Sequence, residues 1–145
     1  MKLEEIKTYQ QLRRLLEEAT WQRFEEIVGK IFELHEYEIE VGKVITFAHT
    51  KRQYDVIAKQ NRKLIVTDCK KWDNRRRITY GLKKAVEDQI ERVAKLPHGN
   101  EKYPMIVLSC QSPVTYYHQV PIVPVFKLNT FLLNFPINKE RLLRV

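Results

Sequence analysis

The sequence predicts an α/β fold, in which helices flank a mixed β-sheet, and the order of its apolar patterns is the basis of this prediction. Two segments near the N-terminus carry apolar residues at helical spacing, and three strand-like segments follow them. A further helical segment separates these strands from a later apolar run, as in a parallel crossover. We therefore expect two helices, three strands, a helix and then further strands.

Two helices are predicted before the first strand. The segment 8–19 (TYQQLRRLLEEA) begins with Thr8 as a plausible N-cap and has Gln11 three positions later, which is a capping-box pattern. A second helix is predicted over 21–35, because apolar side chains there share one broad face, namely Trp21, Phe24, Ile27, Val28, Ile31 and Phe32. Glu25 lies at the edge of this face, where a glutamate is unusual.

Three strands are expected next. Residues 36–47 (EYEIEVGKVITF) alternate polar and apolar side chains as a half-buried strand does, with Gly42 as a turn or bulge. The segments 53–60 (QYDVIAKQ) and 63–72 (KLIVTDCKKW) are joined by a short polar turn, which indicates two adjacent strands. In an antiparallel hairpin, the start of the first segment would lie beside the end of the second.

The rest of the chain is expected to complete the sheet. A helix is predicted over 78–96 and a buried strand over 103–110. For Gln89, a position on the helix surface is favoured over one that faces the cleft. The segment 120–128 (VPIVPVFKL) predicts a short edge strand, because its prolines cannot donate to a ladder. Asn129 is expected to cap a last short helix over 130–135.

Length and composition indicate one globular domain over residues 1–145, with 43% hydrophobic and 30% charged residues. The sequence shows neither the apolar run of a signal peptide nor the roughly 20 apolar residues that span a bilayer, so a cytoplasmic protein is expected. Cys69 and Cys110 lie in apolar runs without metal-ligand spacing, which favours buried thiols over zinc ligands.

The net charge of +8 comes from one stretch of the sequence. Residues 59–84 contain ten of the 26 basic residues and two of the 18 acidic ones, which leaves equal numbers of each elsewhere. Clustered Lys and Arg residues bind phosphates and release counterions. This stretch therefore favours a nucleic-acid partner over a merely solvated surface.

Two carboxylates and an ammonium are expected to converge at one end of the hairpin. Residues two apart share a face of a strand, so Asp68 and Lys70 continue the apolar face of Leu64 and Val66. Asp55 opens the neighbouring strand and would lie beside Asp68. Two carboxylates about 5 Å apart repel by roughly 3 kcal/mol, so the pair requires a cation or a proton. Oxygen ligands favour Mg²⁺ or Mn²⁺, which can activate water for phosphodiester hydrolysis.

These motifs resemble the PD-(D/E)xK nuclease superfamily, and within it the Mrr-like restriction enzymes and archaeal Holliday junction resolvases. The matching pieces are WQRFEEIV, QYDVIA and VTDCKKW. The resemblance implies a restriction-endonuclease-like core (α-β-β-β-α-β) and a metal-dependent endonuclease acting on duplex or branched DNA. By this resemblance, Asp55 and Asp68 would bind Mg²⁺ or Mn²⁺ together with the Cys69 backbone carbonyl. Glu25 would add a metal or water contact, and Lys70 would orient and activate the attacking water.

Several alternatives stay open at this point. Glu26, the neighbour of Glu25, is a second candidate for the helix carboxylate. A basic run that includes an aromatic is predicted to contact nucleic acid, although a solvated loop is an equal alternative for each member: Lys71, Trp72, Arg75, Arg76 and Arg77. The competing functions are a catalytically inactive nucleic-acid-binding module and a subunit that contacts RNA or another protein. A homodimer is expected, because cutting two strands suits two-fold symmetry.

Overall fold

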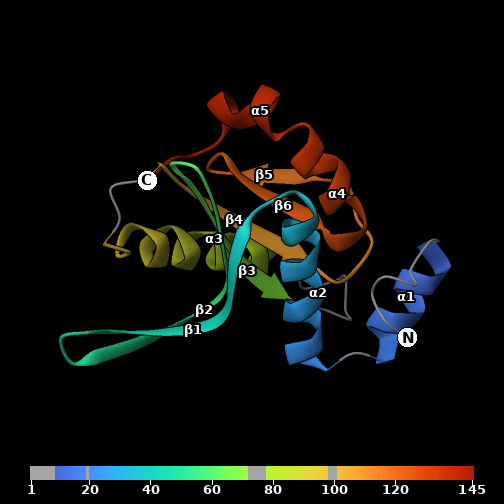
Figure 1. Ribbon diagram of the computed structural model, residues 1–145, viewed down its shortest axis with the longest axis horizontal. Coiled ribbons are helices and arrows are strands. Elements are labelled where there is room, and N and C mark those ends of the chain that lie inside the picture. The colour runs from blue at the N-terminus through green and yellow to red at the C-terminus, as the bar shows by residue number, and fades with distance from the viewer. Residues whose placement is uncertain (1–8, 19, 72–77, 98–100) are drawn as a thin grey trace.

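The computed structural model describes residues 9–18, 20–71, 78–97 and 101–145, which contain a six-stranded mixed sheet with helices on both faces (Figure 1). The strand order is β1-β2-β3-β4-β6-β5. In chain order the elements are α1 (Tyr9–Glu18), α2 (Trp21–Leu34), β1 (Glu38–Phe47), β2 (Thr50–Gln60), β3 (Lys63–Lys70), α3 (Ile78–Ala94), β4 (Glu101–Leu108), β5 (Thr115–Tyr117), β6 (Val120–Pro124), α4 (Val125–Leu133) and α5 (Phe135–Asn138). The predicted fold class is confirmed, and the proposed cap at Thr8 lies outside the described residues.

The alternating side chains of β3 divide the core into two layers. Ile65 and Cys69 pack with residues of α2 and α4, whereas Leu64 and Val66 pack with residues of α3. Strand β3 pairs with β2 in antiparallel and with β4 in parallel orientation, and α3 makes the crossover between β3 and β4. The central strand is thus covered on both faces, which explains why its side chains from Leu64 to Cys69 are all buried.

Strand β6 corrects the prediction of an edge strand over 120–128. It lies between β4 and β5, and all five of its residues are buried. The prolines are tolerated there because the ladders are short: β6 pairs with β4 only from Ile122 to Pro124, so Pro121 precedes that ladder and Pro124 ends it. The edge position belongs to the three-residue strand β5.

Helix α4 begins at Val125, five residues before the predicted last helix. Pro124 occupies its N-cap position with extended backbone angles, and Asn129 lies inside the helix rather than at its cap. Its buried side chains follow helical spacing, at Val125, Leu128, Phe131 and Leu132. No helix within the described residues is long and apolar enough to cross a membrane.

The β1–β2 hairpin extends well beyond the rest of the sheet (Figure 1). Strand β2 begins at Thr50, three residues earlier than the prediction, and pairs with β1 along nearly its whole length. Its pairing with β3 is limited to Val56–Gln60. Residues 43–54 therefore form a two-stranded projection without a neighbour in the sheet, and we call this segment the arm.

Helix α3 ends on a buried lysine of β4. Lys102 has 7% of its surface exposed, and its Nζ donates to the carbonyl oxygens of Leu96 at 2.9 Å and Ala94 at 3.4 Å. These carbonyls lie at the C-terminal end of α3, where the helix leaves acceptors unsatisfied and where the dipole favours a positive charge. Lys102 thus fixes this end of the helix to the central sheet.

Replacing Lys102 with methionine should lower the free energy of unfolding by about 1–3 kcal/mol, because the helix end then loses its charged donor and leaves buried carbonyls unpaired. Urea titration measures this change. The matched control is Lys127→Met on the exposed surface of α4, which should change stability by less than about 0.5 kcal/mol. Equal effects of the two variants would contradict the capping role of Lys102.

Candidate active site

Asp55 lies at the fork where β2 separates from β3. The β2–β3 ladder ends with the pair Val56 and Thr67, so Asp55 and Asp68 are the next positions along the two strands. The backbone amide of Cys69 lies beyond the end of the β2–β3 ladder, and it donates to the side chain of Asp55, at 2.8 Å from Oδ2. The carboxylate therefore acts as the acceptor for this amide, and this hydrogen bond fixes its position against β3.

Gly42 faces Asp55 across the hairpin and marks a break in the alternation of both strands. Val41 pairs with Val56 and Lys43 pairs with Tyr54, while Gly42 and Asp55 between them are unpaired. Before the break, Ile39 and Val41 pack against the core cluster that contains residues of α2; after it, Ile45 and Phe47 pack against the cluster that contains Val93 of α3. The φ of Gly42 is +67°, a left-handed conformation that favours glycine. The predicted turn or bulge at Gly42 is thus a change of face.

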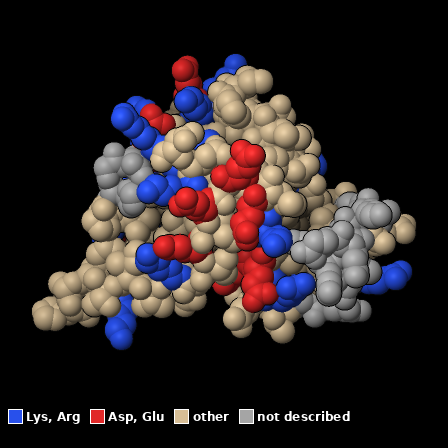
Figure 2. Space-filling model, viewed as in Figure 1, with Lys and Arg blue, Asp and Glu red and all other residues tan. Residues whose placement is uncertain are grey.

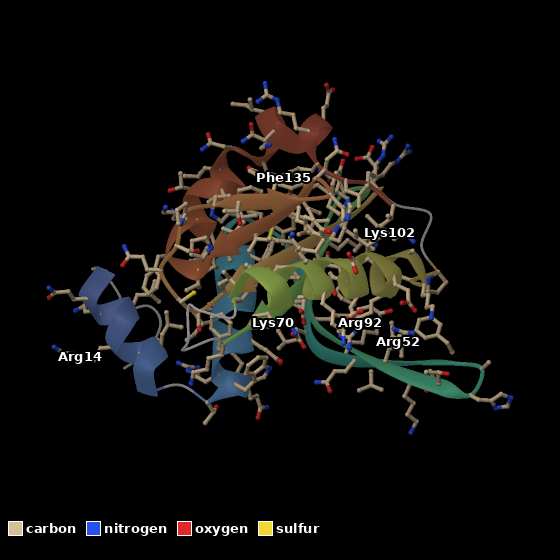
Figure 3. The ribbon with its side chains drawn as sticks, turned by 180° about the vertical axis from the view of Figure 1, so that it is seen from behind. Arg14, Arg52, Lys70, Arg92, Lys102 and Phe135 are labelled. Carbon is tan, nitrogen blue, oxygen red and sulfur yellow. The ribbon has the colours of Figure 1, made fainter. Side chains whose placement is uncertain are left out.

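Three carboxyl groups and one ammonium meet at this fork. Asp55 is hydrogen-bonded to Asp68 on one side and to Glu25 on the other. Lys70 Nζ lies 3.2 Å from Asp68 Oδ2. The four groups come from three elements, α2, β2 and β3, and Figure 3 shows Lys70 between α2 and the beginning of α3. The structure therefore brings together the four side chains that the sequence predicted to act jointly.

Helix α2 carries Glu25 into this site with its carboxyl group buried. Thr20 caps the helix, accepting a hydrogen bond from the Arg23 amide, so that Trp21 and Glu25 lie one turn apart on the same side. Only 5% of Glu25 is exposed. Burial raises the pKa of Glu25, while hydrogen bonds from Asp55 and from the Trp21 side chain lower it and the charge of Asp68 raises it.

Trp21 does not belong to the core, which corrects the sequence prediction. It is 44% exposed, and its indole N–H, the only side-chain donor of tryptophan, points to Glu25. Glu26 is also exposed and forms an ion pair with Arg23 at 3.2 Å. Of the two neighbouring glutamates, Glu25 is thus the one that lies with Asp55 and Asp68.

Asp68 has the most perturbed carboxyl group of the three. Burial raises its pKa to about 6, the ammonium of Lys70 lowers it, and the hydrogen bond and charge of Asp55 raise it further. Burial likewise raises the pKa of Asp55, against the stabilising hydrogen bonds from Asp68 and from the Cys69 amide. Without a bound cation, the cluster therefore keeps a proton up to a higher pH than an isolated carboxyl group does, because ionisation would bury several like charges together.

Cys69 contributes its backbone to the site, whereas its side chain belongs to the core. The thiol is fully buried and forms no disulfide bond, and burial raises its pKa well above the ordinary value. In a strand, the N–H and C=O of one residue point the same way, so the Cys69 carbonyl faces the fork together with its amide. Cys110, which lies two residues beyond β4, is half-buried.

Helix α3 supports the fork from the opposite face of the sheet. Gln89 was predicted to lie on the helix surface, but it is 2% exposed and its Nε2 donates to the Val66 carbonyl at 2.9 Å. Tyr54 donates its hydroxyl to the Arg92 carbonyl at 2.8 Å. Gln89 departs from the apolar pattern of its helix, so pattern analysis alone did not distinguish a buried amide from an exposed one.

The predicted nucleic-acid contacts are only partly described. Lys71 follows β3 directly and is half-buried. Trp72, Arg75, Arg76 and Arg77 lie outside the described residues. The basic run thus begins next to Lys70, at the end of the strand that carries Asp68.

The donor set at the fork suits a hard divalent cation. Among the residues that the structure describes, no three His, Cys, Asp or Glu side chains are spaced as a complete metal-ligand group. Mg²⁺ needs no such group, because it keeps several waters and binds through one or two carboxylates. Asp55, Asp68 and the Cys69 carbonyl offer oxygen ligands, and a positive ion would replace the proton that the carboxyl groups otherwise share.

Comparisons with known proteins identify the family and the fold of this chain. The family model Mrr_cat, described as a restriction endonuclease, matches residues 16–110, which include Glu25, Asp55, Asp68 and Lys70. This chain belongs to the Mrr_cat restriction endonuclease family. No curated protein matches the chain at a significant level.

Two solved structures share the restriction-endonuclease-like fold. The small subunit (R.BspD6I2) of the heterodimeric restriction endonuclease R.BspD6I is 14% identical, with a TM-score of 0.51; the match covers 92% of this chain and 80% of that subunit. A protein of unknown function, AF1548, is 15% identical, also with a TM-score of 0.51. That match covers 61% of this chain, and the chain spans 47% of AF1548.

Replacing Asp68 with asparagine should stabilise this restriction endonuclease family member at neutral pH in the absence of divalent cations. The pKa of Asp68 is about 6 in the folded chain against 3.8 for the free group, so the folded state binds more protons between these values. The free energy of unfolding of the wild type therefore falls as pH rises from about 4 to about 6. The variant escapes this loss and should gain about 3 kcal/mol at pH 8.

Thermal and urea unfolding at several pH values with chelator present measure the difference. Asp88→Asn on the exposed surface of α3 is the matched control for the replacement of one aspartate by asparagine. A difference between Asp68→Asn and the wild type that is constant with pH would contradict the raised pKa.

Proposed function

We propose that this chain is a metal-dependent endonuclease that hydrolyses phosphodiester bonds in DNA. The observation that carries the proposal is the meeting of Glu25, Asp55, Asp68 and Lys70 at the fork of β2 and β3, in a chain of the Mrr_cat family. The net charge of +8 suits a polyanionic substrate. In this proposal Asp55, Asp68 and the Cys69 carbonyl hold Mg²⁺ or Mn²⁺, and Glu25 adds a metal or water contact.

The bound ion would lower the pKa of a water molecule and offset charge on the phosphate. The residues of the chain do the positioning. Lys70 is about 29% exposed and directed at Asp68, so it can orient and activate the attacking water and stabilise the charge that develops on the phosphate oxygens. The water oxygen forms the new bond to phosphorus, the bond to the leaving oxygen breaks, and the leaving oxygen takes up a proton.

Duplex, branched and single-stranded DNA incubated with Mg²⁺ or Mn²⁺ test this function. The wild type should produce cleavage that a chelator abolishes. Asp68→Ala and Lys70→Met should each lower the rate by about 10²–10⁴-fold, because each removes a group that acts on the reacting atoms. Lys127→Met is the control for loss of one positive charge and should cleave as the wild type does. No cleavage of any of these substrates would contradict the proposed function.

A catalytically inactive nucleic-acid-binding module is the alternative that the same experiment separates. Such a module would bind DNA in a salt-sensitive way, with an affinity unchanged by divalent cations and by Lys70→Met. The raised pKa of Asp68 favours the enzyme, because an inactive module has no need to bury three carboxyl groups beside one another.

Trp21 is proposed to act as a positioning residue through Glu25. The Trp21→Phe variant removes the indole N–H that favours ionised Glu25, so the pKa of Glu25 rises and less of it is ionised at a given pH. The rate of DNA cleavage should fall about threefold to tenfold at pH 6, with much less effect at pH 8. Equal losses at both pH values would show that Trp21 acts on the substrate rather than through Glu25.

The assembly state and the cellular location stay predictions. A homodimer suits the cleavage of two strands. The small subunit R.BspD6I2 belongs to a heterodimeric enzyme, which supports a partner subunit in general without favouring an identical one. A cytoplasmic, single-domain protein over residues 1–145 is likewise proposed on composition alone.

A further inference from the structure

The charged residues of the β1–β2 hairpin change from mainly acidic to basic where the arm begins at the fork. On the sheet side of Gly42, β1 carries Glu38 and Glu40. From Val41 to Tyr54 the sequence contains no aspartate or glutamate, while it contains Lys43, Lys51, Arg52 and His49. Figure 2 shows acidic side chains in the middle of the molecule and none on the projecting arm at the lower left. Lys43 is ion-paired with Glu40 at 2.7 Å and Arg52 with Glu91 at 3.1 Å. The outer part of the arm, which carries the exposed Lys51 and no acidic residue, is therefore the part that is complementary to a negatively charged partner.

One face of the arm is fixed and the other is open. Ile45 and Phe47 pack against the cluster that contains Tyr54 and Val93, and Arg52 forms an ion pair with Glu91 at 3.1 Å. Figure 3 shows Arg52 and Arg92 where the arm passes α3. These contacts hold the arm at a set angle to the fork.

The open face presents groups that can contact base edges. Val44 pairs with Gln53 and Thr46 pairs with Lys51, and all four side chains are exposed, Val44 at 57%. A glutamine amide can form two hydrogen bonds with the major-groove edge of adenine, a lysine ammonium can bind guanine, and apolar groups can contact the thymine methyl group. The major groove of B-form DNA is wide enough for a two-stranded β-ribbon.

We propose that the arm binds in the major groove of duplex DNA and places the substrate at the fork, which deepens the proposed nuclease function and rests on it. Gln53 lies two residues from Asp55 on the same strand, a separation of about 7 Å. A duplex that contacts Gln53 therefore has backbone phosphates within reach of Asp55 and Lys70. Duplex RNA is excluded from this mode, because its major groove is too deep and narrow for protein side chains.

Binding of a short fluorescent DNA duplex, measured by anisotropy at one salt concentration in the Asp68→Asn background, tests the arm separately from cleavage. Lys51→Glu should weaken duplex binding about tenfold, because it removes one phosphate or base contact and adds repulsion. Gln53→Ala should weaken it about fivefold. The matched control is Lys127→Glu on α4, at the far end of the molecule from the arm, which should stay within about twofold (Figure 1).

Two further measurements identify the groove and the nucleic acid. The bound protein should protect guanine N7, a major-groove atom, from methylation, and Lys51→Glu should lose this protection. Duplex RNA of the same sequence should bind more weakly than DNA and should be insensitive to Gln53→Ala. Protection of adenine N3 instead, a minor-groove atom, would overturn the groove assignment.

Failure of this inference is distinguishable from failure of the proposed function. Normal metal-dependent cleavage, together with equal DNA affinity of Lys51→Glu and Lys127→Glu, would overturn the arm proposal and leave the nuclease intact. Arm-dependent DNA binding without any cleavage would support the arm and contradict the nuclease. A change of oligomeric state in Lys51→Glu with unchanged DNA affinity would assign the open face to a protein partner and overturn the proposal.

Discussion

The separation of β2 from β3 at Asp55 is the constraint on which the site depends. A strand that leaves its neighbour exposes backbone donors, and here the amide of Cys69 is satisfied by the Asp55 carboxylate at 2.8 Å. The same separation leaves room beside Asp68 for a buried carboxyl group from α2, that of Glu25. A single divergence of two strands thus accounts for both the position of the carboxylates and the start of the arm.

When no cation is bound, the ionised carboxyl groups of the cluster lower the free energy of unfolding of the chain. Three carboxyl groups with raised pKa values are held together by shared protons and by one ammonium, that of Lys70. The folded chain is thus locally destabilised by a cluster of carboxyl groups with perturbed pKa values, a property that is typical of functional sites. The surrounding support is correspondingly extensive: Lys102 fixes the end of α3, and Gln89 of that helix holds the Val66 carbonyl.

Periodicity and strand ends predicted the fold class and the meeting of Asp55, Asp68 and Lys70, because these depend on local pattern and on one antiparallel register. Properties that depend on contacts between distant segments were missed. Trp21 matches the apolar face of α2 but is exposed, because its indole N–H is hydrogen-bonded to Glu25 and the ring does not pack in the core. Gln89 is buried only because the Val66 carbonyl accepts from it. The prolines of β6 suggested an edge strand. The strand is internal because its ladder with β4 is only three residues long, and the length of that ladder depends on tertiary packing.

The outer end of the arm, at residues 48–50, turns through exposed residues, whereas its base is fixed by Tyr54, Arg52 and the unpaired position at Gly42. Residues can therefore be added in pairs at the outer end without displacing Asp55. The length of this hairpin can then change while the carboxyl groups at the fork keep their positions. The reach of the projection and the geometry of the carboxyl cluster are therefore structurally independent within one continuous strand.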